Sequence, residues 1–108
     1  MANFETQIDN TQKVLGSFAL TKADGSAVGI TGLTVSVLSG DGTFLMTDAA
    51  GNPLAVEQVY FVSGAGTGDT VYEVNVLNAV RATIATVTAH VVEGVLSVSV
   101  SFSAPELK

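Results

Sequence analysis

Hydrophobic and polar residues alternate with a period of two along much of this chain. The clearest case is the segment 95–102, in which Leu96, Val98, Val100 and Phe102 alternate with serines. This period is typical of a β-strand that buries one face and exposes the other. On this basis we predict strands over residues 12–22, 33–37, 56–62, 71–77, 83–92 and 95–102, with a short further candidate over 43–46.

Residues that favour tight turns separate the predicted strands. Asp24-Gly25 and Asp41-Gly42 predict short hairpins, because Asp bonds its own backbone and Gly adopts positive φ. The segment 64–69 contains three glycines and predicts a longer, mobile hairpin loop. Turn signals spaced roughly 8 to 12 residues apart predict an all-β chain of about seven strands, arranged as a β-sandwich.

Length and composition support one β-rich domain. The 108 residues include 17 Val, 12 Thr and 3 Ile, and β-branched residues favour strands over helices. A chain of this length can form one stable core without disulfides. We expect the sandwich to span residues 12–102, between an N-terminal arm or tail over 1–11 and a C-terminal tail over 103–108. Pro105 opposes a central strand in this last segment.

The predicted N-terminal arm is polar apart from Phe4 and Ile8. Two interpretations are open for it. The segment is a frayed terminus, or it is an arm whose Phe4 and Ile8 dock on a neighbouring subunit, since free termini are ordered only where something holds them.

Charge and hydropathy exclude two classes of partner. The net charge is −6, from 10 acidic and 4 basic residues, and the basic residues lie far apart in the sequence. No basic patch for phosphates results, so we expect no nucleic-acid partner. No apolar run reaches the roughly 20 residues of a membrane span, so we expect no membrane partner. The first ten residues lack the pattern of a secretory signal, which predicts assembly in a cytoplasm.

His90 is the only side chain whose ordinary pKa lies near neutrality, so acid–base chemistry at pH 7 would depend on it. In a strand it shares a face with Thr86 and Thr88, which predicts a structural or surface histidine. The nearest approach to a Gly-x-Ser-x-Gly nucleophile motif is the segment 61–66, in which Ser63 lacks the glycines that the motif requires on both sides. We therefore expect no catalytic residue and no enzymatic activity.

Metal and cofactor sites are not predicted either. Asp24, Asp41, Asp48 and Asp69 lie in predicted loops, where carboxylates could bind Ca²⁺, but their spacing does not follow a calcium-loop motif. We interpret them as turn-forming residues. The glycine string 62–68 is followed by a strand pattern and not by a phosphate-binding helix, so we expect no nucleotide and no other cofactor.

Interface residues are the remaining candidates for function. Tyr60 and Phe61 are adjacent, so a strand would place them on opposite faces and leave one of them partly exposed. Aromatic side chains supply much of the binding energy at protein interfaces. The candidate interface residues are Phe4, Ile8, Tyr60, Gly64, Gly66 and Gly68.

Several segments resemble the bacterial immunoglobulin-like domains. They are 18–27 (FALTKADGSA), 35–43 (VSVLSGDGT), 47–51 (TDAAG) and 84–87 (IATV). The resemblance covers about residues 12–102 and implies an immunoglobulin-like β-sandwich. Domains of this family occur in adhesins and in small bacteriophage structural proteins, and the family has no catalytic residues to carry over.

The resemblance implies a protein that works by contact. We expect a bacteriophage virion structural or accessory protein, for capsid decoration or for the tail, that binds capsid or tail proteins and forms a homo-oligomer. It would be located in the virion after assembly in the host cytoplasm. The alternative is a module that binds a glycan or another cell-surface polymer through its loops. Aromatic residues make up only 6% of the chain, which weighs against that alternative.

Overall fold

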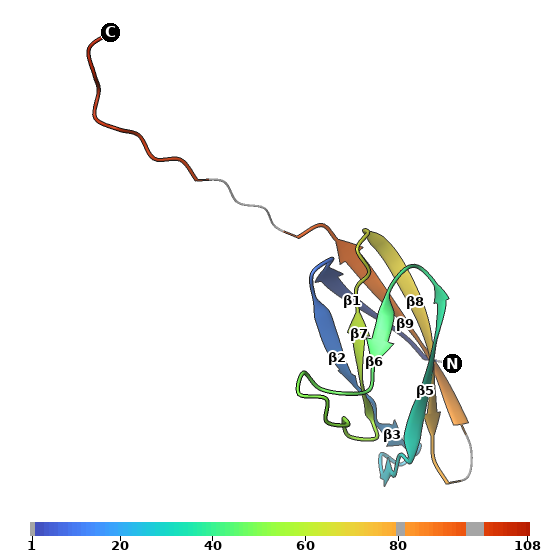
Figure 1. Cartoon of the computed structure of the whole chain (residues 1–108). Helices are drawn as coiled ribbons and strands as arrows, with labels where there is room; N and C mark the ends of the chain where they lie inside the picture. The colour runs from blue at the N-terminus through green and yellow to red at the C-terminus, as the bar shows by residue number, and fades with distance from the viewer. Residues whose placement is uncertain (1, 80–81, 95–98) are drawn as a thin grey trace.

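The computed structural model describes residues 2–79, 82–94 and 99–108, which form nine β-strands and no helix (Figure 1). The chain is therefore all-β, as the alternation predicts. The strands are β1 (Ala2–Asp9), β2 (Lys13–Ser17), β3 (Leu20–Thr21), β4 (Ala27–Val28), β5 (Gly32–Ser39), β6 (Thr43–Leu45), β7 (Gln58–Val62), β8 (Gly68–Leu77) and β9 (Ala82–Val92).

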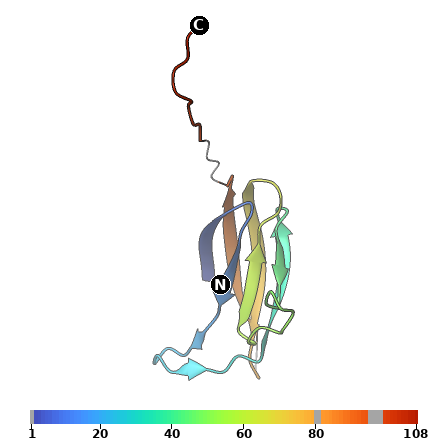
Figure 2. The ribbon, with the colours of Figure 1, turned by 60° about the vertical axis from the view of Figure 1, so that its left-hand side comes forward.

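The strands form two larger sheets and one small hairpin. The first sheet has the order β1-β9-β8-β5, and the second has the order β2-β7-β6. β1 runs parallel to β9, whereas the other pairs are antiparallel. The two larger sheets lie face to face in the body of the molecule, and β3 with β4 forms a separate two-stranded sheet at one end (Figure 2).

The core lies between the two larger sheets. Val59 and Phe61 of β7 contribute from one side, and alternate residues of β8 and β9 contribute from the other. The rings of Phe61 and Tyr72 join the two layers, with centroids 4.7 Å apart and planes inclined at 54°. Every second residue of these strands is buried, because successive side chains of a strand point to opposite faces.

One of the predicted hairpins is confirmed. β3 and β4 pair across Asp24-Gly25, with Leu20 opposite Val28, and Gly25 has a φ of +87°. The carboxylate of Asp24 accepts hydrogen bonds from the amide and the hydroxyl of Ser26, at 2.9 and 2.6 Å. Glycine suits the turn because it adopts positive φ without steric cost.

The other two predicted hairpins are wrong. Asp41-Gly42 connects β5 to β6, and the segment 64–67 connects β7 to β8, but each pair of strands lies in different sheets. Both segments therefore cross from one sheet to the other. Local turn chemistry marks where a strand ends, but it does not determine which strand pairs with which.

The two ends of the chain differ from the prediction. Residues 2–9, predicted as part of an arm or tail, form β1 and pair along their whole length with β9. The predicted strand over 95–102 lies partly outside the described residues, and its described part, 99–102, has no strand structure. The predicted strand over 12–22 is divided into β2 and β3, because β2 pairs with β7 whereas Leu20 and Thr21 pair with β4.

Candidate functional site

An apolar groove of about 500 Å³ lies between the edges of the two larger sheets. It is open along the side where β1 ends the first sheet and β2 ends the second. Its apolar lining includes Phe4, Val14, Phe18, Leu20, Ile84 and Val87. This set of residues is called the apolar groove below.

Each wall of the apolar groove ends in a strand with one unpaired edge. Within the described part of the chain, β1 pairs with β9 alone and β2 pairs with β7 alone. Such an edge presents backbone N–H and C=O groups that can pair with a further strand. Phe4, which lines the groove, is 52% exposed, so apolar surface remains uncovered beside these edges.

Sequence reasoning identified Phe4 but missed the rest of this groove. Val14, Phe18 and Leu20 lie in the predicted strand over 12–22, and they are partly buried against the core. No local signal distinguishes a core position from a groove position, since both are apolar and alternate with polar residues. The groove exists because β1 joins the sheet of β9 and not the sheet of β2.

The predicted interface glycines lie elsewhere, in the connection between β7 and β8 and at its end. The Gly66 amide donates to the Asp41 carboxylate at 3.1 Å, and the Asn10 side chain donates to the carbonyl of Ala65 at 3.2 Å. A Cβ at Gly64 would overlap the carboxylate of Asp41. A side chain at position 64 would therefore require the Asp41 carboxylate to move.

The remaining predicted interface residues do not join the glycines. Ile8 is 7% exposed and is one of the buried residues of its own chain. Its side chain is therefore not available in this structure for docking on a neighbouring subunit. Gly68 begins β8 with a φ of +110°. The candidates therefore fall into four places: Phe4 in the groove, Ile8 in the interior, the glycines at a loop and Tyr60 on β7.

Tyr60 and Phe61 occupy opposite faces of β7, as predicted. Phe61 is 3% exposed in the core, whereas Tyr60 is half-buried on the outer face. The ammonium of Lys13 lies over the Tyr60 ring, 4.3 Å from its centroid. This cation–π contact occupies one face of the ring and joins β2 to β7.

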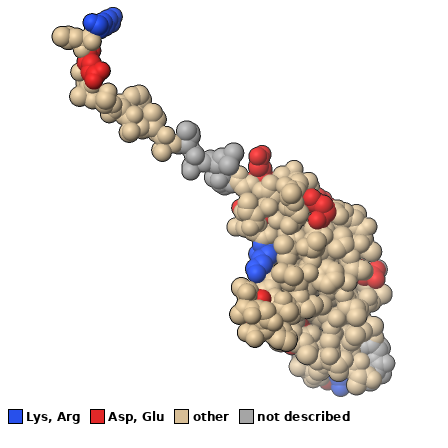
Figure 3. Space-filling model, viewed as in Figure 1, with Lys and Arg blue, Asp and Glu red and all other residues tan. Residues whose placement is uncertain are grey.

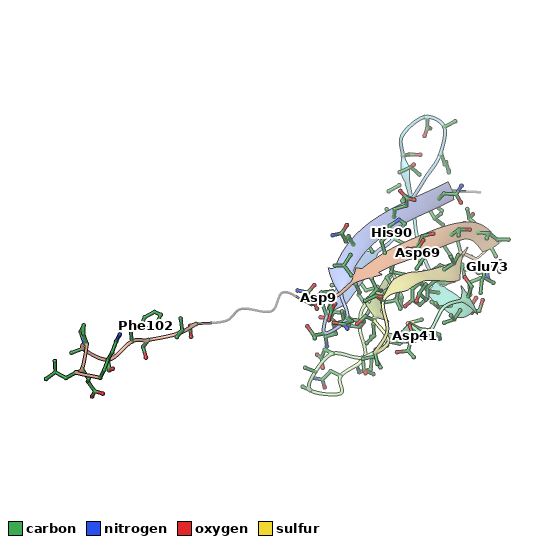
Figure 4. All side chains as sticks on the ribbon, turned by 90° about the horizontal axis from the view of Figure 1, so that it is seen from above. Asp9, Asp41, Asp69, Glu73, His90 and Phe102 are labelled. Atoms are coloured by element: carbon green, nitrogen blue, oxygen red, sulfur yellow. The ribbon has the colours of Figure 1, made fainter. Side chains whose placement is uncertain are left out.

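His90 lies on the polar face of β9, opposite the buried Ala89 and Val91, as the strand pattern predicts. Its Nδ1 is 2.7 Å from the carboxylate of Asp69 on β8, and its Nε2 is 3.4 Å from the carboxylate of Glu5 on β1 (Figure 4). The hydrogen bond with Asp69 is the main reason why the pKa of His90 is raised, and Glu5 adds to the effect. Both ring nitrogens face carboxylates, so this arrangement favours the imidazolium form.

The four aspartates that were predicted to lie in loops have separate roles. Asp24 and Asp48 close turns by accepting hydrogen bonds from nearby amides, and Asp41 holds the Gly66 amide of another loop. Asp69 is not in a loop, because β8 begins one residue earlier. Across the ranges that the structure describes, no three His, Cys, Asp or Glu side chains are grouped so as to share a metal ion.

Comparison with known proteins does not assign a family. No protein-family model, no curated protein and no solved structure matches this chain. The described residues also contain no helix that could cross a lipid bilayer. The function must therefore be argued from the groove, the free strand edges and the surface.

Proposed function

We propose that the chain is a non-catalytic module with an immunoglobulin-like β-sandwich fold, and that its task is to hold another protein at the apolar groove. The setting implied by the sequence resemblance is a bacteriophage virion, in which the module would bind capsid or tail proteins. The groove, with its two unpaired strand edges, is the observation that carries the proposal.

The strand order supports an immunoglobulin-like fold. Immunoglobulin constant domains place strands A, B, E and D in one sheet and C, F and G in the other. Here β2-β7-β6 corresponds to the B-E-D row and β5-β8-β9 to the C-F-G row. The first strand differs from strand A of a constant domain, because β1 pairs with β9 and not with β2.

Tyr72 supports the same fold. Its hydroxyl donates to the backbone carbonyl of Thr43 at 2.9 Å and to that of Val62 at 3.3 Å. Immunoglobulin-like domains have a tyrosine near the start of strand F whose hydroxyl bonds to the backbone upstream, two residues before a buried position. Tyr72 lies in β8, and Val74 two residues later is 0% exposed.

The surface favours contact with protein over chemistry on a small molecule. The face seen in Figure 3 is mostly uncharged, with scattered carboxylates. The groove is lined mainly by apolar residues, and Glu5, the one ionisable residue in its lining, directs its carboxylate to His90 on the outer face of the sheet. An apolar channel beside unpaired backbone suits an extended peptide segment, which bonds through its main chain and inserts alternate side chains.

The proposal is tested by co-sedimentation of the full chain with virions purified from the strain that encodes it. We expect saturable binding by the wild-type chain and at least a tenfold weaker binding by Phe4→Asp, which places a charge in the groove. The matched control is Asn3→Asp, on the opposite face of the same strand, which should bind like wild type. Absence of saturable binding by the wild-type chain would refute the virion role.

Glycan binding stays the alternative prediction. Its aromatic candidate, Tyr60, has one ring face covered by the Lys13 ammonium, which leaves less free platform for a sugar ring. A glycan array probed with the wild-type chain and with Tyr60→Ala tests it. Saturable hits that disappear in Tyr60→Ala would favour the glycan function over the virion function.

A further inference from the structure

The C-terminal segment is the most exposed apolar part of the described chain. Val100 is 74% exposed, Phe102 is 88% exposed and Leu107 is 100% exposed. Residues 99–108 lie away from the sheets (Figures 1 and 2), and the whole molecule measures 81 × 28 × 27 Å. Phe102 lies far from the sheets in the view from above (Figure 4).

This exposed segment has the sequence of a strand. Val100 and Phe102 alternate with serines, which continues the period of two that begins at Leu96. Within its own copy the described segment 99–104 pairs with no strand. An exposed apolar segment with a strand pattern is typical of a segment that binds another surface.

The apolar groove offers the complementary surface. Among the described strands, β2 has one unpaired edge because the first strand of the chain joins β9, which leaves a strand position open beside β2. The edge of β1 faces the same groove. A strand placed here would bond to one of these edges and point every second side chain at the apolar lining.

We propose that the segment 99–104 of one copy adds as a strand at the apolar groove of a second copy, with Val100 and Phe102 inserted between the two sheets. The inference rests on the proposed function, since it uses the same groove and names a second copy as a protein that the groove holds besides a capsid or tail protein. Pro105 ends the inserted strand, because proline donates no ladder hydrogen bond.

The position of the groove favours a second copy over the chain's own tail. The groove is lined by residues in the first half of β1 and β9, including Phe4 and Ile84, whereas the segment 99–104 follows β9 in the chain, and β9 ends at Val92. Residues 99–108 point away from the sheets in this structure and would have to reverse their direction to reach the groove of the same copy. Every copy carries one groove and one segment, so the contact is head-to-tail.

Charge adds a second argument for an apolar contact between copies. The segment 99–105 contains no charged residue, while each copy has a net charge of −6. Two such copies repel at low ionic strength, and salt screens that repulsion. Association should therefore strengthen as salt is added, which is opposite to the behaviour of a contact held by ion pairs.

Sedimentation of the full chain over a concentration series tests the proposal. We expect reversible association of the wild-type chain and at least a tenfold increase in its dissociation constant in Phe102→Asp. Leu107→Asp is the matched control, because it makes the same change beyond Pro105, and it should associate like wild type. Far-ultraviolet circular dichroism of each variant should match wild type, since neither side chain contacts the sheets.

A mixing experiment tests the head-to-tail geometry. Phe102→Asp retains a groove, and Phe4→Asp retains a tail, so a mixture of the two should form a one-to-one complex that neither forms alone. A wild-type chain that stays monomeric at all concentrations would overturn the inference, as would equal losses in Phe102→Asp and Leu107→Asp. If the monomeric wild-type chain still binds virions, the inference fails while the proposed function stands; loss of both would refute both.

Discussion

The hydroxyl group of Tyr72 connects three strands, and removal of this hydroxyl tests how the two sheets are held together. It donates from β8 to the carbonyl of Thr43 on β6 at 2.9 Å and to that of Val62 on β7 at 3.3 Å. Tyr72→Phe removes both bonds and keeps the ring against Phe61, 4.7 Å away between centroids.

The expected loss follows from the two distances. A hydrogen bond contributes about 1 kcal/mol net to folding, and the longer bond shares its donor with the shorter one. We therefore expect the free energy of unfolding to fall by about 1 to 1.5 kcal/mol. For a chain of this size that corresponds to a decrease in Tm of roughly 4 to 8 °C.

Urea unfolding followed by far-ultraviolet circular dichroism measures this loss directly. The control is Tyr60→Phe, which removes a hydroxyl that makes no hydrogen bond within the described residues and keeps the ring under Lys13. We expect Tyr60→Phe to stay within about 0.5 kcal/mol of wild type, as surface changes usually do. Equal losses in the two variants would refute the assignment of a joining role to the Tyr72 hydroxyl.

Three further outcomes are expected from the same structure. Asp69 and Glu5 raise the pKa of His90 in the folded protein. The ion pairs of His90 therefore stabilise the fold fully at pH values below the pKa of an unfolded histidine, and this contribution is lost as the pH rises through the pKa of His90 in the folded protein. In urea titrations, the stability difference between wild type and His90→Gln should shrink from pH 5.5 to pH 8.5. Burial, with a smaller effect of Asp41, raises the pKa of Tyr72. Wild type should therefore lose stability more steeply than Tyr72→Phe as pH rises above about 10. Parallel curves of unfolding free energy against pH for the two proteins would contradict this. Gly64→Ala should lower the free energy of unfolding by about 1 kcal/mol, because the new Cβ displaces Asp41 from the Gly66 amide. Gly29→Ala, where a Cβ meets nothing within 4 Å, should be near neutral. A Gly64→Ala loss that persists in full in an Asp41→Ala background would contradict this explanation.

The sequence determined the class of the fold and the faces of its strands. Alternation of side chains is a local property of an extended backbone, so the pattern correctly placed His90 on a polar face and separated Tyr60 from Phe61. The turn at Asp24-Gly25 was equally predictable, since its carboxylate and its positive φ act within a few residues.

Only the tertiary structure decided which strands pair and what lies between them. The residues from Ala2 to Asp9 carry a weak strand pattern, yet they form β1 because the edge of β9 supplies a ladder along their whole length. That parallel pairing removes the first strand from β2 and opens the apolar groove. Pairing between segments about eighty residues apart depends on the free energy of the whole fold, and no local spacing in the chain encodes it.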